Sequence, residues 1–148
     1  MGHGITSRDG VFSVRLPMWH RLGTVLTDYP TRQEAQKLVH PWEPVEEPLY
    51  RKHSGIDPVS GDLWERFEEL DTHRLNVRSD DGHELGVVTD TYEPVSNAEL
   101  YDIAEAIESG DPTSVRYETG GSLKGGSKVW LLIRLAEPLM VKGDPRGE

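Results

Sequence analysis

The stretch RLNVRSDDGHELGVV (residues 74–88) decides most of what can be inferred about the fold. Polar and apolar side chains alternate through residues 74–78, and a second run with apolar positions follows at residues 84–88. The pair Asp81-Gly82 between two such runs is a strong signal for a β-hairpin. The stretch therefore predicts two antiparallel strands joined by a tight turn.

A helix is expected on each side of this hairpin in the sequence. Thr31 with Glu34, and Ser96 with Glu99, have the three-residue spacing of a capping box. The first helix should end at about His40, because a proline follows. In the second helix, we expect one face to be apolar and to lie on the sheet (Leu100, Ile103, Ala104 and Ile107) and the other to be acidic and solvated (Glu99, Asp102, Glu105 and Glu108).

Short strands and turns are expected in the rest of the chain. Residues 1–30 predict an extended N-terminal arm or an edge strand with a turn, and prolines limit residues 42–50 to an edge strand. Residues 51–63 predict a loop or hairpin tip, and a glycine-rich loop is expected between strands at residues 114–119 and 128–135. Together these elements predict an α+β fold, with a mainly antiparallel sheet, β-hairpins and two helices packed on it.

Length and composition favour one soluble domain. The chain has 148 residues, 35% of them hydrophobic, which predicts a single domain over residues 1–148 with a modest core in residues 31–142. There is no cysteine, so disulfides and thiolate chemistry are excluded. The N-terminus lacks the apolar run of a signal peptide, and no segment approaches the ~20 apolar residues of a membrane span. We therefore expect a cytoplasmic protein that does not bind membranes.

The net charge of −10 is unevenly distributed along the chain. Residues 43–111 carry five Lys/Arg and nineteen Asp/Glu, whereas residues 1–42 and 112–148 each have a small excess of basic residues. Nonspecific DNA binding depends on neutralising phosphates, so this acidity disfavours strong binding by a monomer. The acidic middle is either a solvated face or a surface for a basic partner.

The sequence contains no recognisable catalytic or metal-binding pattern. In residues 121–128 (GSLKGGSK) the last glycine is followed by Ser-Lys and then by a β-rich run, whereas a P-loop requires Lys-Ser or Lys-Thr and a helix. None of the six histidines lies three or four residues from another, and the neighbouring carboxylates Asp80-Asp81 fall in a turn. We therefore expect no enzymatic activity, no metal and no cofactor.

Four basic residues near the C-terminus are the candidates for binding a nucleic-acid backbone. Lys124 and Lys128 lie at the tip of the expected glycine-rich hairpin, and Arg116 and Arg134 lie in its flanking strands. The alternative is a flexible hairpin whose lysines are simply solvated.

Tryptophans could stack on unpaired bases. Trp19 and Trp42 lie in irregular segments and are the better surface candidates. Trp130 lies within the apolar run VWLLI and is expected in the core.

Several short segments, taken in order, resemble one family. They are residues 19–26 (WHRLGTVL), 78–88, 92–97 (YEPVSN), 117–123 (YETGGSL) and 129–132 (VWLL). The pattern is similar to a family of phage- and plasmid-borne proteins that contain a domain of unknown function. Its members are typically longer, which implies that this chain is either a naturally short version or a fragment that corresponds to their N-terminal half. The resemblance implies a bacteriophage or mobile-element protein in a bacterial host cell.

The family context and the basic C-terminal third lead to one principal hypothesis. We expect single-stranded DNA binding or annealing during phage recombination, through Arg116, Lys124, Lys128, Arg134 and Trp19. The order of elements also resembles that of single-strand annealing proteins, which act as oligomers, so a homo-oligomer is expected. The alternative is a protein-interaction or anti-defence factor that binds a host protein through its acidic helix face.

Overall fold

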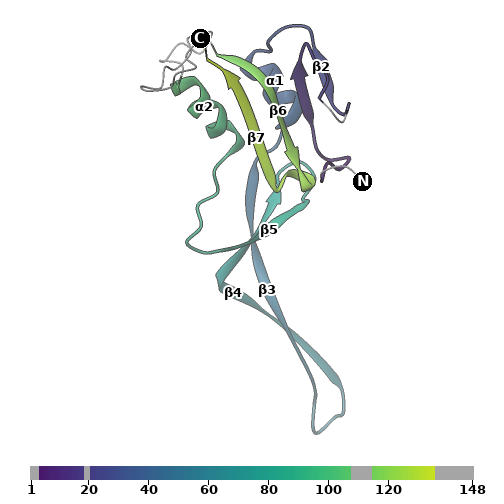
Figure 1. The fold of residues 1–148 in the computed structure, drawn as a ribbon. Coiled ribbons are helices and arrows are strands. Elements are labelled where there is room, and N and C mark those ends of the chain that lie inside the picture. The colour runs from purple at the N-terminus through teal and green to yellow at the C-terminus, as the bar shows by residue number, and fades with distance from the viewer. Residues whose placement is uncertain (1–3, 19–20, 108–114, 136–148) are drawn as a thin grey trace, which may run out of the picture. The chain divides into compact units, whose positions relative to one another are not determined.

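The computed structural model describes residues 4–18, 21–107 and 115–135. Within these residues the chain forms seven β-strands and two α-helices, which group into two compact units (Figure 1). Unit 1 comprises residues 1–41 and 95–148, and unit 2 comprises residues 42–94. The predicted α+β class with mostly antiparallel strands is confirmed.

A four-stranded sheet of order β2-β1-β6-β7 forms the base of unit 1. Its strands are β1 (Val11–Val14), β2 (Thr24–Leu26), β6 (Arg116–Leu123) and β7 (Lys128–Arg134). β2 is parallel to β1, and the other neighbouring strands are antiparallel. The segment predicted as an extended arm is thus part of the sheet. β1 is an interior strand with all four residues buried, three of them apolar.

Both helices pack on one face of this sheet, as predicted. α1 (Arg32–Val39) begins at Thr31, whose hydroxyl accepts from the Glu34 N–H at 3.3 Å while the Glu34 carboxylate accepts from the Thr31 N–H at 2.8 Å. α2 (Asn97–Ile107) begins with the same reciprocal pair between Ser96 and Glu99. Both capping boxes are therefore confirmed.

The core of unit 1 lies between the helices and the sheet. Its central residues are contributed by β1, both helices and β6, and they are buried (Phe12, Val14, Ala35, Val39, Tyr101, Ala104, Val115 and Tyr117). Leu131 and Ile133 of β7 pack against this cluster.

The buried face of α2 differs from the predicted one. Ile103 and Ile107 are 56% and 57% exposed, and Asn97, Tyr101 and Ala104 are buried instead. These three residues also share one face at helical spacing, so the helix is rotated about its axis relative to the prediction. Tyr101 can be buried because its hydroxyl has a partner inside the unit, a contact that periodicity does not reveal.

Unit 2 is a three-stranded antiparallel sheet of order β3-β4-β5. Its strands are β3 (Pro44–Ile56), β4 (Leu63–Arg78) and β5 (Glu84–Thr89). β4 and β5 form the hairpin predicted from residues 74–88. β3 is an edge strand, as the prolines indicated, with Pro44 as its first residue and Pro48 at a register shift.

The β3–β4 hairpin is much longer than predicted. Residues 51–63 were expected to form a loop, but pairing continues to Ile56↔Leu63, so only residues 57–62 connect the strands. Two of the acidic residues that weakened the strand signal in β4 have basic partners on β3: Glu68 lies opposite Arg51, and Glu65 forms a diagonal ion pair with Lys52. Such cross-strand partners are set by register and cannot be read from one strand alone.

No helix in the described ranges is long and apolar enough to cross a membrane. The prediction of a single domain concerns whether the two units unfold together, and it stays a prediction.

Candidate nucleic-acid interface

The sheet of unit 1 has an inner face, which carries the core, and an outer face. Paired residues on neighbouring strands point to the same face, and successive residues alternate between faces. Phe12, Leu131 and Ile133 belong to the core, so the strand positions next to them point outward. The outer face is defined by the paired positions Val11, Ser13, Val25, Arg116, Thr119, Gly121, Leu123, Lys128, Trp130, Leu132 and Arg134.

The four predicted cations form two basic pairs at opposite ends of this face. Arg116 and Arg134 are direct cross-strand partners at one end. Lys128 lies at the other end, close in sequence to Lys124 in the turn η1 (Lys124–Gly126). All four are exposed. From Lys128 to Arg134 the strand covers roughly 20 Å, at about 3.3 Å per residue.

The charges on this face are not neutralised by the surrounding described residues. No carboxylate among them forms an ion pair with any of the four cations. None of the outer-face positions is acidic, and Glu118, at the β6 irregularity, accepts a hydrogen bond from the Tyr29 hydroxyl at 3.3 Å. Like charges directly opposite on a sheet repel, so an anion bound between Arg116 and Arg134 would stabilise that end.

Trp130 lies on the outer face between the two basic pairs and is partly exposed, so its predicted core position is wrong. Its ring lies over Gly121, where an added Cβ would come within 2.6 Å of an indole carbon. Leu132 beside it is 54% exposed. The apolar run VWLLI predicted burial of the whole strand, but successive residues of a strand point to opposite faces of the sheet. Trp19, the predicted stacking residue, lies outside the described residues.

The glycine-rich segment is a strand through Leu123, not a loop. Its glycines allow other groups to approach the backbone closely. A Cβ at Gly120 would come within 2.9 Å of the Phe12 ring, and one at Gly121 within 2.7 Å of the Gly10 carbonyl oxygen. The glycines are therefore packing residues between β1, β6 and β7.

The turn that carries Lys124 is held by a buttress of hydrogen bonds. Asp9 accepts from the Ser122 hydroxyl at 2.8 Å, the Gly125 N–H at 3.1 Å and the Thr6 N–H at 2.7 Å. Burial raises the pKa of Asp9, but these hydrogen bonds outweigh it and hold the pKa below its ordinary value. Lys124 itself has a left-handed backbone, with φ of 55°, and its N–H donates to the Gly4 carbonyl at 2.6 Å. Its Cα is thus held at a defined place beside the outer face.

On the inner side of the sheet lie two separate groups of hydrogen-bonded side chains. The fully buried His40 donates from Nε2 to the Gly121 carbonyl at 2.9 Å and accepts at Nδ1 from the Tyr101 hydroxyl at 3.0 Å. Tyr117 donates to Glu105 at 3.3 Å. Burial lowers the pKa of His40. Burial and the neighbouring Glu105 carboxylate raise the pKa of Tyr117 to about 12. His40 has no exposed surface. We therefore infer that these hydrogen bonds serve to hold β6 against the helices.

The acidic face expected on α2 is largely engaged within unit 1. Arg32 of α1 pairs with Asp102 at 2.6 Å and with Glu105 at 2.9 Å. Glu99 belongs to the capping box, and Glu108 lies outside the described residues. A basic partner would therefore have to displace Arg32 before it could use this face.

Trp42, the second predicted stacking candidate, is buried in unit 2. It is 3% exposed, and the Arg78 guanidinium lies 4.5 Å from its ring centroid. Arg78 also pairs with Asp80 at 2.6 Å, a hydrogen bond that lowers the pKa of this carboxyl. The Ser79 hydroxyl accepts from the Glu43 N–H at 2.9 Å. The segment Arg78-Ser79-Asp80 therefore fixes the start of β3.

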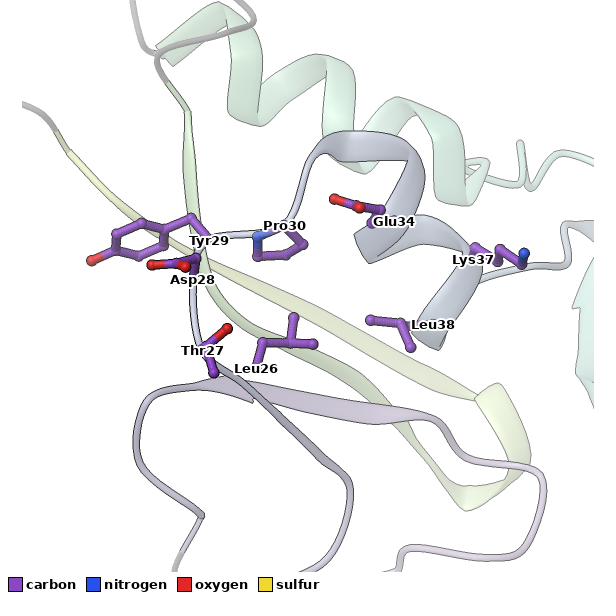
Figure 2. A pocket seen from close by; sticks show the side chains of 8 residues that line it. All are labelled: Leu26, Thr27, Asp28, Tyr29, Pro30, Glu34, Lys37 and Leu38. Carbon is purple, nitrogen blue, oxygen red and sulfur yellow. The ribbon is translucent and has the colours of Figure 1, made fainter.

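An open pocket of 530 Å³ lies beside α1 and the segment that precedes it (Figure 2). Its lining mixes apolar side chains, such as Leu26 and Leu38, with Asp28, Glu34 and Lys37. Glu34 is already bound to the helix N-terminus, and two carboxylates against one lysine do not suit a phosphate. Across the described parts of the chain, no group of three His, Asp or Glu residues is placed to hold a metal ion.

Comparison with known families finds a similarity in the C-terminal part of the chain. Residues 84–148 match the model of a family described as a domain of unknown function, DUF932. This segment is therefore similar to the DUF932 family. The predicted family resemblance is thereby confirmed, with a match narrower than the near-complete coverage expected. No curated protein and no solved structure matches the chain.

The DUF932 segment contains β5, α2, β6, η1 and β7. It therefore supplies both basic pairs, Trp130 and the helix with the buried Tyr101. β1 and β2, which complete the sheet, come from outside it.

Proposed function

We propose that the outer face of unit 1 binds single-stranded DNA, and that the protein is a non-enzymatic phage or mobile-element factor acting in strand annealing. One observation carries the proposal. Two basic pairs flank a partly exposed tryptophan on a sheet face whose paired positions include no acid. Single-strand binders combine these two elements, cations for the backbone and an aromatic ring for the bases.

The division of charge between the units supports this proposal. Unit 2 carries five Lys/Arg and fourteen Asp/Glu, whereas unit 1 carries eleven and twelve. Most of the net charge of −10 therefore resides in unit 2, whereas the strands that form the basic face belong to unit 1. The acidity of the whole chain predicts weak binding to duplex DNA, while the local field of the outer face of unit 1 favours phosphates.

The test is fluorescence anisotropy of a labelled single-stranded oligonucleotide over a salt series. Four backbone contacts predict a slope of log K against log salt of about −2.8, because each contact to a single strand contributes about −0.7. Lys124→Gln with Lys128→Gln, or Arg116→Gln with Arg134→Gln, should each flatten the slope by about 1.4. Trp130→Leu should weaken binding by about 1–3 kcal/mol and leave the slope unchanged.

The matched control is Lys37→Gln. Lys37 is exposed on α1, which covers the inner face, so its loss should change neither affinity nor slope. Absence of binding at low salt would contradict the proposal, and so would an equal effect of Lys37→Gln and of the outer-face variants. If binding is found, pairing of complementary oligonucleotides measured with the same variants tests annealing.

A second candidate is a protein-interaction or anti-defence role, which the acidity of unit 2 favours. Its partner would be a basic host protein that binds unit 2 rather than the α2 face. Replacing Glu68 and Glu69 by Gln should weaken that association and leave DNA binding unchanged, since both lie in unit 2. An association with the host protein that these replacements leave unchanged, together with weaker DNA binding, would exclude this role.

A further inference from the structure

The distal part of the β3–β4 hairpin is a two-stranded arm with one apolar face. We define the arm as residues 50–56 and 63–69, which pair from Tyr50↔Glu69 to Ile56↔Leu63. This stretch lies beyond the pairing with β5, which begins at His73. A two-stranded hairpin is marginally stable by itself in water, so an unsupported arm of this length calls for a partner.

Register divides the arm into two different faces. One face, which we call the arm face, carries four rows of paired residues from base to tip: Tyr50 with Glu69, Lys52 with Phe67, Ser54 with Glu65, and Ile56 with Leu63. The opposite face is mostly charged and includes the ion pair of His53 with Glu68 at 2.6 Å. Antiparallel sheets commonly bury one face and solvate the other, and here the arm face is the one suited to burial.

The apolar side chains of the arm face are strongly exposed. Tyr50 is 52% exposed, Phe67 63%, and Ile56 and Leu63 both 69%. Together they form a patch on the order of 500 Å², which is near the upper end for a monomer and often marks an interaction site. A standard interface buries about 800 Å² on each partner, so pairing through this face alone predicts an association that reverses on dilution.

We propose that the arm face binds the arm face of a second copy of this chain, with the two arms antiparallel. A two-fold axis requires a surface complementary to itself, and the row order meets this condition. In the antiparallel arrangement the tip row of one copy, Ile56 with Leu63, lies over the base row of the other, which contains Tyr50. The row of Lys52 and Phe67 lies over the row of Ser54 and Glu65.

Charge complementarity supports a second copy as the occupant. In this arrangement Lys52 of each copy meets Glu65 of the other, while Lys52 also pairs with Glu65 of its own chain. Lys52 and Glu65 of the two arms thus form an alternating set of four charges, while Glu69 of each base row lies at the tip row of the other copy. An anionic membrane or a nucleic acid is disfavoured, because the arm carries three Lys/Arg and three Glu within a unit of five Lys/Arg and fourteen Asp/Glu.

The first test is sedimentation velocity of the full chain over a concentration series, with circular dichroism to verify folding. The wild-type chain should show a reversible monomer–dimer equilibrium. The double variant Leu63→Thr with Phe67→Thr removes the apolar contacts, while threonine still favours a β-strand. It should raise the dissociation constant of the dimer by about tenfold or more. Val87→Thr is the matched control, because Val87 is 55% exposed on β5, outside the arm, and its change should have no effect.

A mixing experiment separates contacts between copies from contacts within one copy. Lys52→Glu and Glu65→Lys should each weaken the dimer when studied alone, and an equimolar mixture of the two variants should restore association as a heterodimer. A wild-type chain that stays monomeric at all concentrations overturns the proposal, and implies another occupant. A dimer insensitive to the arm-face changes, or a mixture that associates no better than its components, also overturns it. DNA binding by unit 1 is measured separately, so either proposal can fail without the other.

Discussion

Units 1 and 2 are both built on antiparallel hairpins, yet they bury their side chains very differently. Unit 1 covers one face of its sheet with two helices and has a core of fully buried residues such as Phe12, Tyr101 and Tyr117. The described residues of unit 2 form strands and no helix. Their buried side chains are confined to the base of the β3–β4 hairpin, around Trp42 and Val77. The rest of β3 and β4 is largely exposed on both faces.

This difference separates two ways of stabilising a strand. In unit 1 a strand is held mainly by apolar burial, at roughly 25 cal/mol per Å² of apolar surface removed from water. In the arm of unit 2, the strands are held mainly by backbone hydrogen bonds and by surface ion pairs such as Lys52 with Glu65. An exposed ion pair contributes only about 0.2–1 kcal/mol. Unit 1 should therefore dominate the stability of the chain, while the arm remains available for association.

The largest effect should come from truncating one phenylalanine in each unit. Phe12→Ala removes a fully buried ring and should lower the free energy of unfolding by about 3–5 kcal/mol. Phe67→Ala removes a ring that is 63% exposed and should cost less than about 1 kcal/mol. Urea titration of dilute protein followed by circular dichroism measures both. Equal losses would break the contrast between the units.

A glycine in each unit should give the next largest difference. A Cβ at Gly121 would come within 2.7 Å of the Gly10 carbonyl oxygen, which is backbone and cannot move aside, so Gly121→Ala should cost about 1–3 kcal/mol. A Cβ at Gly55 would meet the Trp64 ring at a similar 2.7 Å, but Trp64 is 46% exposed and can rotate away. Gly55→Ala should therefore be close to neutral in the same titration. A larger loss for Gly55→Ala would show that the arm is as tightly packed as unit 1.

The smallest effect should be a pH dependence that originates in unit 1. The pKa of His40 is lowered by burial, so below its ordinary value of 6.5 the unfolded chain takes up a proton that the folded chain does not. The contribution of His40 to the free energy of unfolding should be fully present above pH 6.5. As the pH falls below 6.5, it should decrease by up to about 1.4 kcal/mol per pH unit. The pKa of Tyr117 is raised to about 12, so stability should also fall as the pH rises above about 10.

The variant His40→Gln provides the control for this prediction. It should reduce the loss between pH 6.5 and about 5 while preserving the alkaline loss, as measured by urea titration at each pH. An unchanged acid profile would assign the loss to other groups.

Local signals predicted the elements whose determinants lie close together in the sequence. Thr31 with Glu34 and Ser96 with Glu99 were sufficient for both helix starts, and Asp81-Gly82 was sufficient for the β4–β5 hairpin. The cationic residues were also predicted, because charge and exposure usually go together. Two of the predictions that failed, for the face of α2 and for the position of Trp130, each depended on which side of an element meets the core.

The sequence alone determined the α+β class, the helix starts, the β4–β5 turn and the similarity of residues 84–148 to DUF932, since each depends on short-range chemistry or on resemblance. Only the tertiary structure decided that β1 pairs with β6, more than a hundred residues away, which gives the sheet its outer face. It also decided that Trp130 lies on that face and that β3 extends to Ile56. The physical reason is that strand register and face are set by partners distant in sequence, and a single strand carries no record of them.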